Sequence, residues 1–189
     1  MSLTSVWLMA IPGGSGRDKL IGIMIFLKSD RAERNVANGR DFVEQKDWEN
    51  AKKAFEDALL SFQDLKAWPR AAQVFSSVAL CNCALKEYDQ AYDNLRQSIA
   101  IYQQLGDEEG EANGYLGQGD VLFDKGDNEG ALAAFQKALD IFARLQVYDG
   151  VAYSYRGMEK VYAAMGDKEN AKEARHQSED ARRKLMAVP

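Results

Sequence analysis

The sequence repeats itself every 40 residues. Alanine recurs at this interval at Ala51, Ala91, Ala131 and Ala171. The same interval separates the members of three further sets: Ala32, Ala72, Ala112 and Ala152; Leu65, Leu105, Leu145 and Leu185; and the acidic Asp47, Glu87, Asp127 and Asp167. A fixed period of this size predicts one supersecondary unit stacked several times, because each copy buries its apolar face against the next. The chain should therefore fold as a solenoid.

Each unit reads as two helices joined by a short turn. Apolar or small residues recur three and four positions apart, which is the spacing of one helix face, in Phe55, Ala58, Leu59, Phe62 and Leu65. The pattern returns in the next two units at Leu95, Ser98, Ile99, Tyr102 and Leu105, and at Phe135, Ala138, Leu139, Phe142 and Leu145. Alternating and β-branched runs, which are typical of strands, are almost absent. We therefore expect an all-α domain over 31–189, with units at about 32–71, 72–111, 112–151 and 152–185.

Small residues and turn residues support this prediction. One repeated position on the first helices always carries a small residue, namely Gly39, Ala79 and Gly119. We expect Ala51, Ala91 and Ala131 of the second helices to face this position. Glycine followed by aspartate, at Gly126 and again at Gly166, can end one helix in a left-handed conformation and cap the next.

The third unit carries the fullest pattern, in Tyr115, Gly119, Leu122, Ala131, Phe135 and Ala138. This pattern resembles the tetratricopeptide repeat, whose usual unit has about 34 residues. The 40-residue unit and the missing terminal proline are similar to the long-repeat subclass of kinesin light chains, Pins-type adaptors and Rap regulators. The resemblance implies a right-handed superhelical solenoid of antiparallel helix pairs.

The fourth unit departs from the pattern. Arg175, Glu179 and Arg182 replace the Phe, Leu and Phe of earlier units, so this helix has a polar face of the kind that a terminal capping helix needs. We expect about three full repeats plus a capping helix pair. The alternative is that Leu185 and Met186 lead into further protein.

The resemblance also implies where a ligand would lie, because in this family the first helices line a concave peptide-binding wall. Carried over by register, that wall consists of Glu33, Val36, Arg40, Val43, Gln73, Ser76, Leu80, Cys83, Asn113, Leu116, Asp120, Phe123, Tyr153, Arg156 and Lys160. The partner would be a protein or peptide segment, with acidic groups pairing to Arg156, Lys160 and Arg40. The Lys and Asn clamp that binds chaperone tails is not supplied by Val36 and Ser77.

Other functions find little support in the sequence. The net charge of -5 argues against a nucleic-acid partner. Cys81 and Cys83 point to different faces of a helix, and with the lone His176 they provide no metal framework. His176 has no nucleophile signature around it, and Gly117-Gln118-Gly119 lies within a helix and serves packing. We therefore expect no catalytic residues, no metal and no cofactor, in a protein of the cytoplasm.

The first thirty residues differ from the repeats. Two apolar runs, 6–11 and 20–27, flank a glycine-rich stretch at 12–18. Each run is too short to cross a bilayer, and no positive charge precedes the first, as a secretory signal requires. Three interpretations stay open: an element that caps the first repeat, an adhesive segment for a dimer or a membrane surface, or a linker that joins a foreign peptide lying in the groove.

These observations favour a non-catalytic adaptor or scaffold that binds a protein segment in its concave groove. Two alternatives remain at this point. One is a sensor in which peptide binding changes the curvature and releases a partner. The other is an assembly subunit, a homo-oligomer that associates through residues 1–30.

Overall fold

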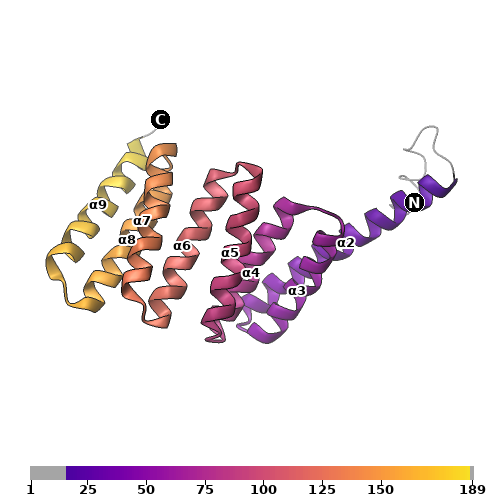
Figure 1. The fold of residues 1–189 in the computed structure, drawn as a ribbon, viewed down its shortest axis with the longest axis horizontal. Coiled ribbons are helices and arrows are strands. Elements are labelled where there is room, and N and C mark those ends of the chain that lie inside the picture. Colours follow the sequence, from indigo (N-terminus) through magenta and orange to yellow (C-terminus); the bar gives the residue numbers. More distant parts are fainter. Residues whose placement is uncertain (1–15, 188–189) are drawn as a thin grey trace.

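The computed structural model describes residues 16–187, and within them every regular element is an α-helix. In chain order the helices are α2 (Gly16–Glu44), α3 (Trp48–Asp64), α4 (Trp68–Ala84), α5 (Tyr88–Leu105), α6 (Glu108–Lys125), α7 (Asn128–Leu145), α8 (Tyr148–Met165) and α9 (Lys168–Ala187). Each helix packs against its neighbours in sequence, and the pairs stack along one axis (Figure 1). The predicted all-α solenoid of helix pairs is confirmed.

One turn design recurs every 20 residues, at half the period of the sequence. The residue that takes a positive φ is in turn Lys46, Lys66, Lys86, Gly106, Gly126, Gln146 and Gly166. The next residue then donates its N–H to a carbonyl five positions back, as in Asp127 to Leu122, at 2.8 Å. These bonds close the end of each helix in a Schellman arrangement and satisfy carbonyls that the helix leaves free.

Aspartate begins the next helix after several of these turns. The carboxylate of Asp127 accepts a hydrogen bond from the N–H of Gly130 at 2.9 Å, and Asp167 does the same for Asn170 at 3.1 Å. These contacts are the N-caps predicted from the sequence. Tight turns of this kind keep successive helices antiparallel and adjacent.

Within a unit, the small register of the first helix receives a large side chain. A Cβ added to Gly39 would lie 2.6 Å from the ring of Phe55, and one added to Gly119 would lie 2.6 Å from the ring of Phe135. The expectation that Ala51 and Ala131 face these glycines stays a prediction, and the atoms nearest to the added Cβ belong to Phe55 and Phe135. The nearest side chain lies one helical turn further along the second helix, because the antiparallel helices bring the aromatic ring over the glycine.

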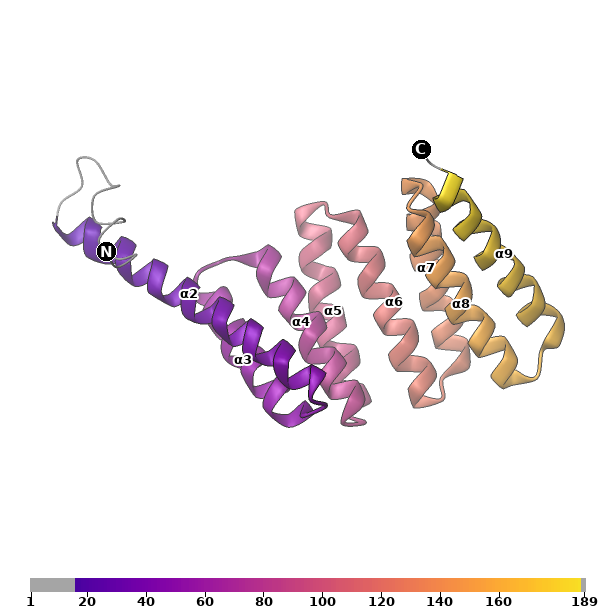
Figure 2. The same ribbon diagram turned by 180° about the vertical axis from the view of Figure 1, so that it is seen from behind.

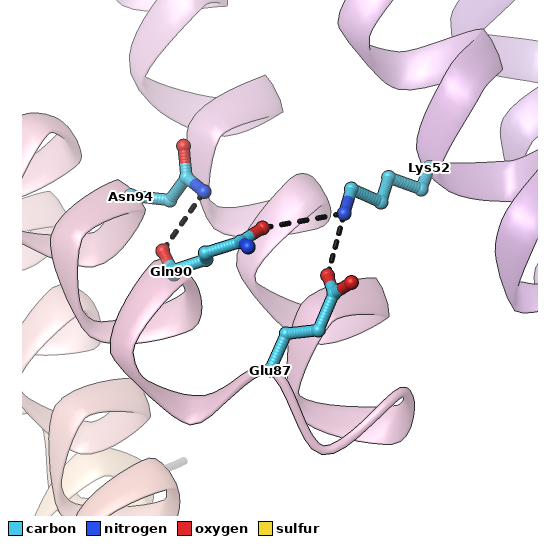
Figure 3. Close-up of polar contacts among 4 residues, drawn as sticks. All are labelled: Lys52, Glu87, Gln90 and Asn94. Carbon is cyan, nitrogen blue, oxygen red and sulfur yellow. Dashed lines mark hydrogen bonds and ion pairs between the residues drawn. The ribbon is translucent and has the colours of Figure 1, made fainter.

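Ion pairs join successive units along the outside of the stack. Lys52 of α3 contacts Glu87, which immediately precedes α5, at 2.5 Å, and its ammonium also lies 3.4 Å from the side-chain oxygen of Gln90 (Figure 3). The Lys52 side chain is only 17% exposed. The hydrogen bond to Glu87 raises the pKa of Lys52, against the smaller opposing effect of burial. This pair therefore links the first unit to the second.

Helix α2 is longer than the others and extends beyond the helices that pack on it (Figures 1 and 2). It runs without a break through residue 30, where the sequence analysis placed a boundary. Several apolar side chains of this extension are exposed, including Leu20, Ile21, Met24 and Ile25. The run 6–11 and the glycine-rich stretch up to residue 15 lie outside the described residues.

Candidate protein-interaction site

Two hollows lie side by side on the face formed by α4, α6 and α8. The first, here called the apolar hollow, measures about 270 Å³ and is lined by Ser76, Ala79, Leu80, Cys83, Leu95, Asn113, Gly117, Asp120 and Val121. The second, here called the charged hollow, measures about 70 Å³ and is lined by Leu116, Asp120, Phe135, Tyr153, Arg156, Gly157 and Lys160. Asp120 borders both hollows, so they adjoin.

The two hollows are the same place in successive units. Leu95, Gly117 and Asp120 in the first correspond, at the 40-residue interval, to Phe135, Gly157 and Lys160 in the second. The difference in volume follows from the side chain at the floor. The ring of Phe135 reaches both Gly119 and Gly157, where an added Cβ would lie within 2.6 Å of it. Leu95 also reaches Gly117, where an added Cβ would lie 2.9 Å from its Cδ2, but it is smaller than phenylalanine and fills less of the space.

The rims of the hollows also differ in polarity. Leu80, which is 53% exposed, borders the apolar hollow at the position that Asp120 holds in the charged hollow. Arg156 stacks on the ring of Tyr153, with its guanidinium carbon 4.7 Å from the ring centre. This contact holds the cation at the rim and fixes its direction.

Asp120 borders both hollows and lies near charged side chains of α6 and α8. Burial of its carboxylate among neighbouring side chains raises its pKa, and the nearby Asp124 raises it further, while Lys160 and Arg156 act in the opposite direction. Two cations of α8, Arg156 and Lys160, therefore lie near two carboxylates of α6, Asp120 and Asp124. The cations of the charged hollow are on its α8 side.

Cys83 closes the other end of the apolar hollow. Its thiol donates a hydrogen bond to Asp124 at 3.3 Å. Burial, followed by this hydrogen bond, raises the pKa of Cys83 to about 12. The side chain therefore stays a neutral thiol at neutral pH, and it contributes to the wall as a small apolar group rather than as a nucleophile.

The structure gathers nine of the residues that the sequence analysis assigned to the wall. They line the two hollows: Ser76, Leu80, Cys83, Asn113, Leu116, Asp120, Tyr153, Arg156 and Lys160. The floor residues were missed, because they lie on second helices or are the small residues of the packing register. The substitution of Leu95 for phenylalanine at a repeated position was the signal that could have found the apolar hollow.

The other six residues lie elsewhere. Val36 is 4% exposed and belongs to the core, and Val43 and Phe123 pack against it. Glu33 and Gln73 both bind Arg70, through its Nε at 2.8 Å and its Nη1 at 2.5 Å respectively. Arg40 is exposed but lines neither hollow.

Residues 16–187 contain neither a metal-binding cluster nor a membrane-spanning helix. No group of three or more His, Cys, Asp or Glu side chains in that range is arranged to hold a metal ion. In the same range, no helix is both long enough and apolar enough to cross a membrane.

Comparisons with known proteins agree with this architecture. Family models of the tetratricopeptide repeat match residues 36–105 and residues 110–184. The chain therefore belongs to the tetratricopeptide repeat family. It is 29% identical over 132 residues to the small glutamine-rich tetratricopeptide repeat-containing protein 2 of Saccharomyces cerevisiae, a match that covers 69% of this chain and 36% of that protein. The chain thus spans about a third of the relative's length.

Solved structures show the same fold at low sequence identity. BtubC (BKLC) from P. vanneervenii superposes with a TM-score of 0.73 at 16% identity, over 84% of this chain and 65% of that one. MamA superposes with a TM-score of 0.63 at 14% identity, over 98% of both chains. The TPR-like repeats of a putative kinesin light chain of Podosopora anserina superpose with a TM-score of 0.69 at 13% identity, over 97% of this chain and 83% of that one.

Proposed function

We propose that this protein is a non-catalytic adaptor that binds a segment of another protein on the face formed by α4, α6 and α8. The observation that supports it most is the pair of adjoining hollows, one apolar and one bordered by Arg156 and Lys160. A bound segment needs both an apolar surface to bury and polar groups that fix its position. Acidic groups on the partner would pair with the two cations.

The test compares partners captured by the intact protein with those captured by an Arg156→Glu, Lys160→Glu variant. Reversing both charges should remove the partners that bind through this face, because it replaces attraction by repulsion at the rim. A Lys53→Glu, Lys172→Glu variant serves as a control, since it makes the same charge change on exposed positions of the second helices α3 and α9. Identical partner sets for the intact protein and the groove variant would refute this face as the binding surface.

Self-association is a second candidate, and the exposed extension of α2 favours it. Leu20 and Met24 are 64% and 70% exposed, one helical turn apart. A depression of about 310 Å³ lies beside them, bordered by Ile21, Met24, Ile25, Lys28, Asp64 and Leu65. Apolar faces of this kind pair readily with a second copy. A mass that stays monomeric at all concentrations in sedimentation equilibrium would remove this candidate.

A further inference from the structure

The repeat itself shows why the apolar hollow exists. The first and third units pair a glycine with a phenylalanine, Gly39 with Phe55 and Gly119 with Phe135. The second unit has Ala79 and Leu95 at these two positions, and both border the apolar hollow. The Phe135 ring of the third unit also lies against Gly157, which belongs to the fourth unit. The equivalent glycine beside the second unit is Gly117 of the third. Leu95 reaches Gly117, where an added Cβ would lie 2.9 Å from its Cδ2, but its side chain is smaller than a phenylalanine ring and fills only part of the space that the ring takes in the third unit.

The chemistry around this space defines what could enter it. Its floor is apolar, and Leu80 stands half-exposed at its mouth. Among its polar groups, the hydroxyls of Ser76 and Ser98 lie 3.0 Å apart and the thiol of Cys83 donates to Asp124, whereas Asn113 and Asp120 are exposed to solvent. A polar side chain that entered would lose its hydrogen bonds to water without replacement, whereas an apolar one would gain from burial.

Resting on the proposed function, we propose that the apolar hollow receives one leucine or phenylalanine side chain of an extended partner segment. In the same segment, a carboxylate about three residues away pairs with Arg156 and Lys160, because equivalent helices lie about 10 Å apart and an extended chain advances about 3.3 Å per residue. The partner's apolar side chain takes the place that the Phe135 ring fills from within in the third unit. Charge complementarity sets the position of the acidic group on the α8 side.

The test uses selection from a random peptide library displayed on phage, followed by affinity measurements on synthetic peptides. Selected sequences should share a leucine or phenylalanine and an aspartate or glutamate about three positions apart, in either chain direction. Replacing the apolar residue of the best peptide by alanine should weaken binding about tenfold, as expected for partial burial of a large side chain. Enrichment of peptides without this spacing would overturn the proposal.

The decisive variant is Ala79→Gly, Leu95→Phe, which rebuilds in the second unit the pair found in the first and third. It should fill the hollow from below without changing the exposed rim, and the apolar-to-alanine change in the peptide should then have no further effect. Circular dichroism and thermal unfolding check that the variant folds. Leu80→Glu, a change at an exposed position of the mouth, provides a second route and should also weaken binding about tenfold or more.

The outcomes separate this inference from the proposed function. Peptides that lose binding to the Arg156→Glu, Lys160→Glu variant but bind the Ala79→Gly, Leu95→Phe and Leu80→Glu variants normally would overturn the apolar anchor and leave the adaptor function standing. Equal binding to all variants would overturn both. If the intact protein self-associates and the Ala79→Gly, Leu95→Phe variant does not, the hollow binds another copy and the proposal is overturned. Tight binding of an amidated peptide of residues 1–12 would assign the hollow to that segment and would overturn the proposal as well.

Discussion

At the scale of single residues, each turn depends on one residue with a positive φ. Glycine adopts this conformation without cost, but four turns use Lys46, Lys66, Lys86 and Gln146 with φ between 54° and 63°. A side chain with a Cβ is strained in the left-handed region by about 1–2 kcal/mol. The repeat therefore carries avoidable strain at four positions that have glycine in the other three turns.

Glycine at any of these four positions should stabilise the protein. We expect each single change, such as Lys86→Gly, to raise the free energy of unfolding by about 0.5–1 kcal/mol, because the relief of strain exceeds the entropy that glycine adds to the unfolded chain. Urea unfolding measures the difference. Lys53→Gly in the interior of α3 is the control and should lower the stability by about 1 kcal/mol. Stability that falls in both cases would contradict the assignment of strain to the turns.

Asn82 is a polar residue at a repeated position that is apolar or aromatic in the other units. The residues at the equivalent place in the other units are Phe42, Leu122 and Tyr162, whereas Asn82 is 1% exposed and its Oδ1 accepts no hydrogen bond from the described residues. We expect Asn82→Leu to raise the free energy of unfolding by about 1–2 kcal/mol, because it removes a buried polar atom without a partner. Asn82→Asp should lower it in the same thermal or urea experiment. A loss of stability with leucine would show that the amide has a role in packing.

At the scale of elements, ion pairs tie one unit to the next. Besides Lys52 with Glu87, Lys125 at the end of α6 contacts Asp89 of α5 at 2.5 Å, whereas Arg144 of α7 contacts Glu108 of α6 at 2.8 Å within one helix pair. Most of these groups are well exposed, so each pair contributes little. The Lys52 pair differs because the Lys52 side chain is only 17% exposed, and its ammonium contacts both Glu87 and Gln90 (Figure 3).

Lys52→Met should therefore cost more than the loss of an exposed pair. We expect the free energy of unfolding to fall by about 1 kcal/mol, because Glu87 loses its partner while the stem of the side chain is retained. Arg96→Met is the control, since Arg96 and Asp93 are each 66% exposed, and it should change the stability by less than about 0.5 kcal/mol. Equal losses in urea unfolding would show that burial does not distinguish the two pairs.

The pH dependence of the Lys52 pair follows from the raised pKa. A lysine whose pKa is higher in the folded than in the unfolded protein contributes its full stability below the unfolded pKa of about 10.4. That contribution is lost as the pH rises through the folded pKa. The difference in stability between the protein and Lys52→Met should accordingly stay constant from neutral pH to about pH 10 and shrink above it.

At the scale of the whole molecule, the fourth unit changes what the stack presents. The positions of Gly119 and Phe135 are taken there by Glu159 and Arg175, which form an ion pair at 2.6 Å. In the third unit the aromatic ring is covered by Gly157 of the next helix pair. Within residues 16–187 no further helix follows α9, and a charged pair leaves that face polar.

Restoring the repeat pattern at this face should make the molecules associate. We expect Glu159→Gly, Arg175→Phe to form dimers or larger species whose amount rises with concentration, because no helix within residues 16–187 covers the new aromatic side chain. Sedimentation velocity measures this. Glu159→Gln, Arg175→Gln removes the charges without adding an aromatic side chain and should not change the association state. An unchanged sedimentation coefficient for the aromatic variant would argue against the ion pair as a barrier to stacking.

The sequence by itself determined the helices, their pairing and most of the turns. These features are local: a helix face, a cap such as Asp127 and a glycine such as Gly126 act within a few residues, and repetition made each signal visible several times. The resemblance to the tetratricopeptide repeat, carried from unit to unit by the 40-residue register, also placed most of the residues that line the two hollows.

Only the tertiary structure decided which side chains meet between helices. The sequence analysis named Ala51 as the residue that faces Gly39 but did not predict that the ring of Phe55, one helical turn further along, lies against the same glycine. The same holds for the apolar hollow, because its depth depends on how far Leu95 reaches toward Gly117 on a helix of the following unit. Contacts across units depend on distances in three dimensions, and a periodic pattern in one dimension records only that such positions are equivalent.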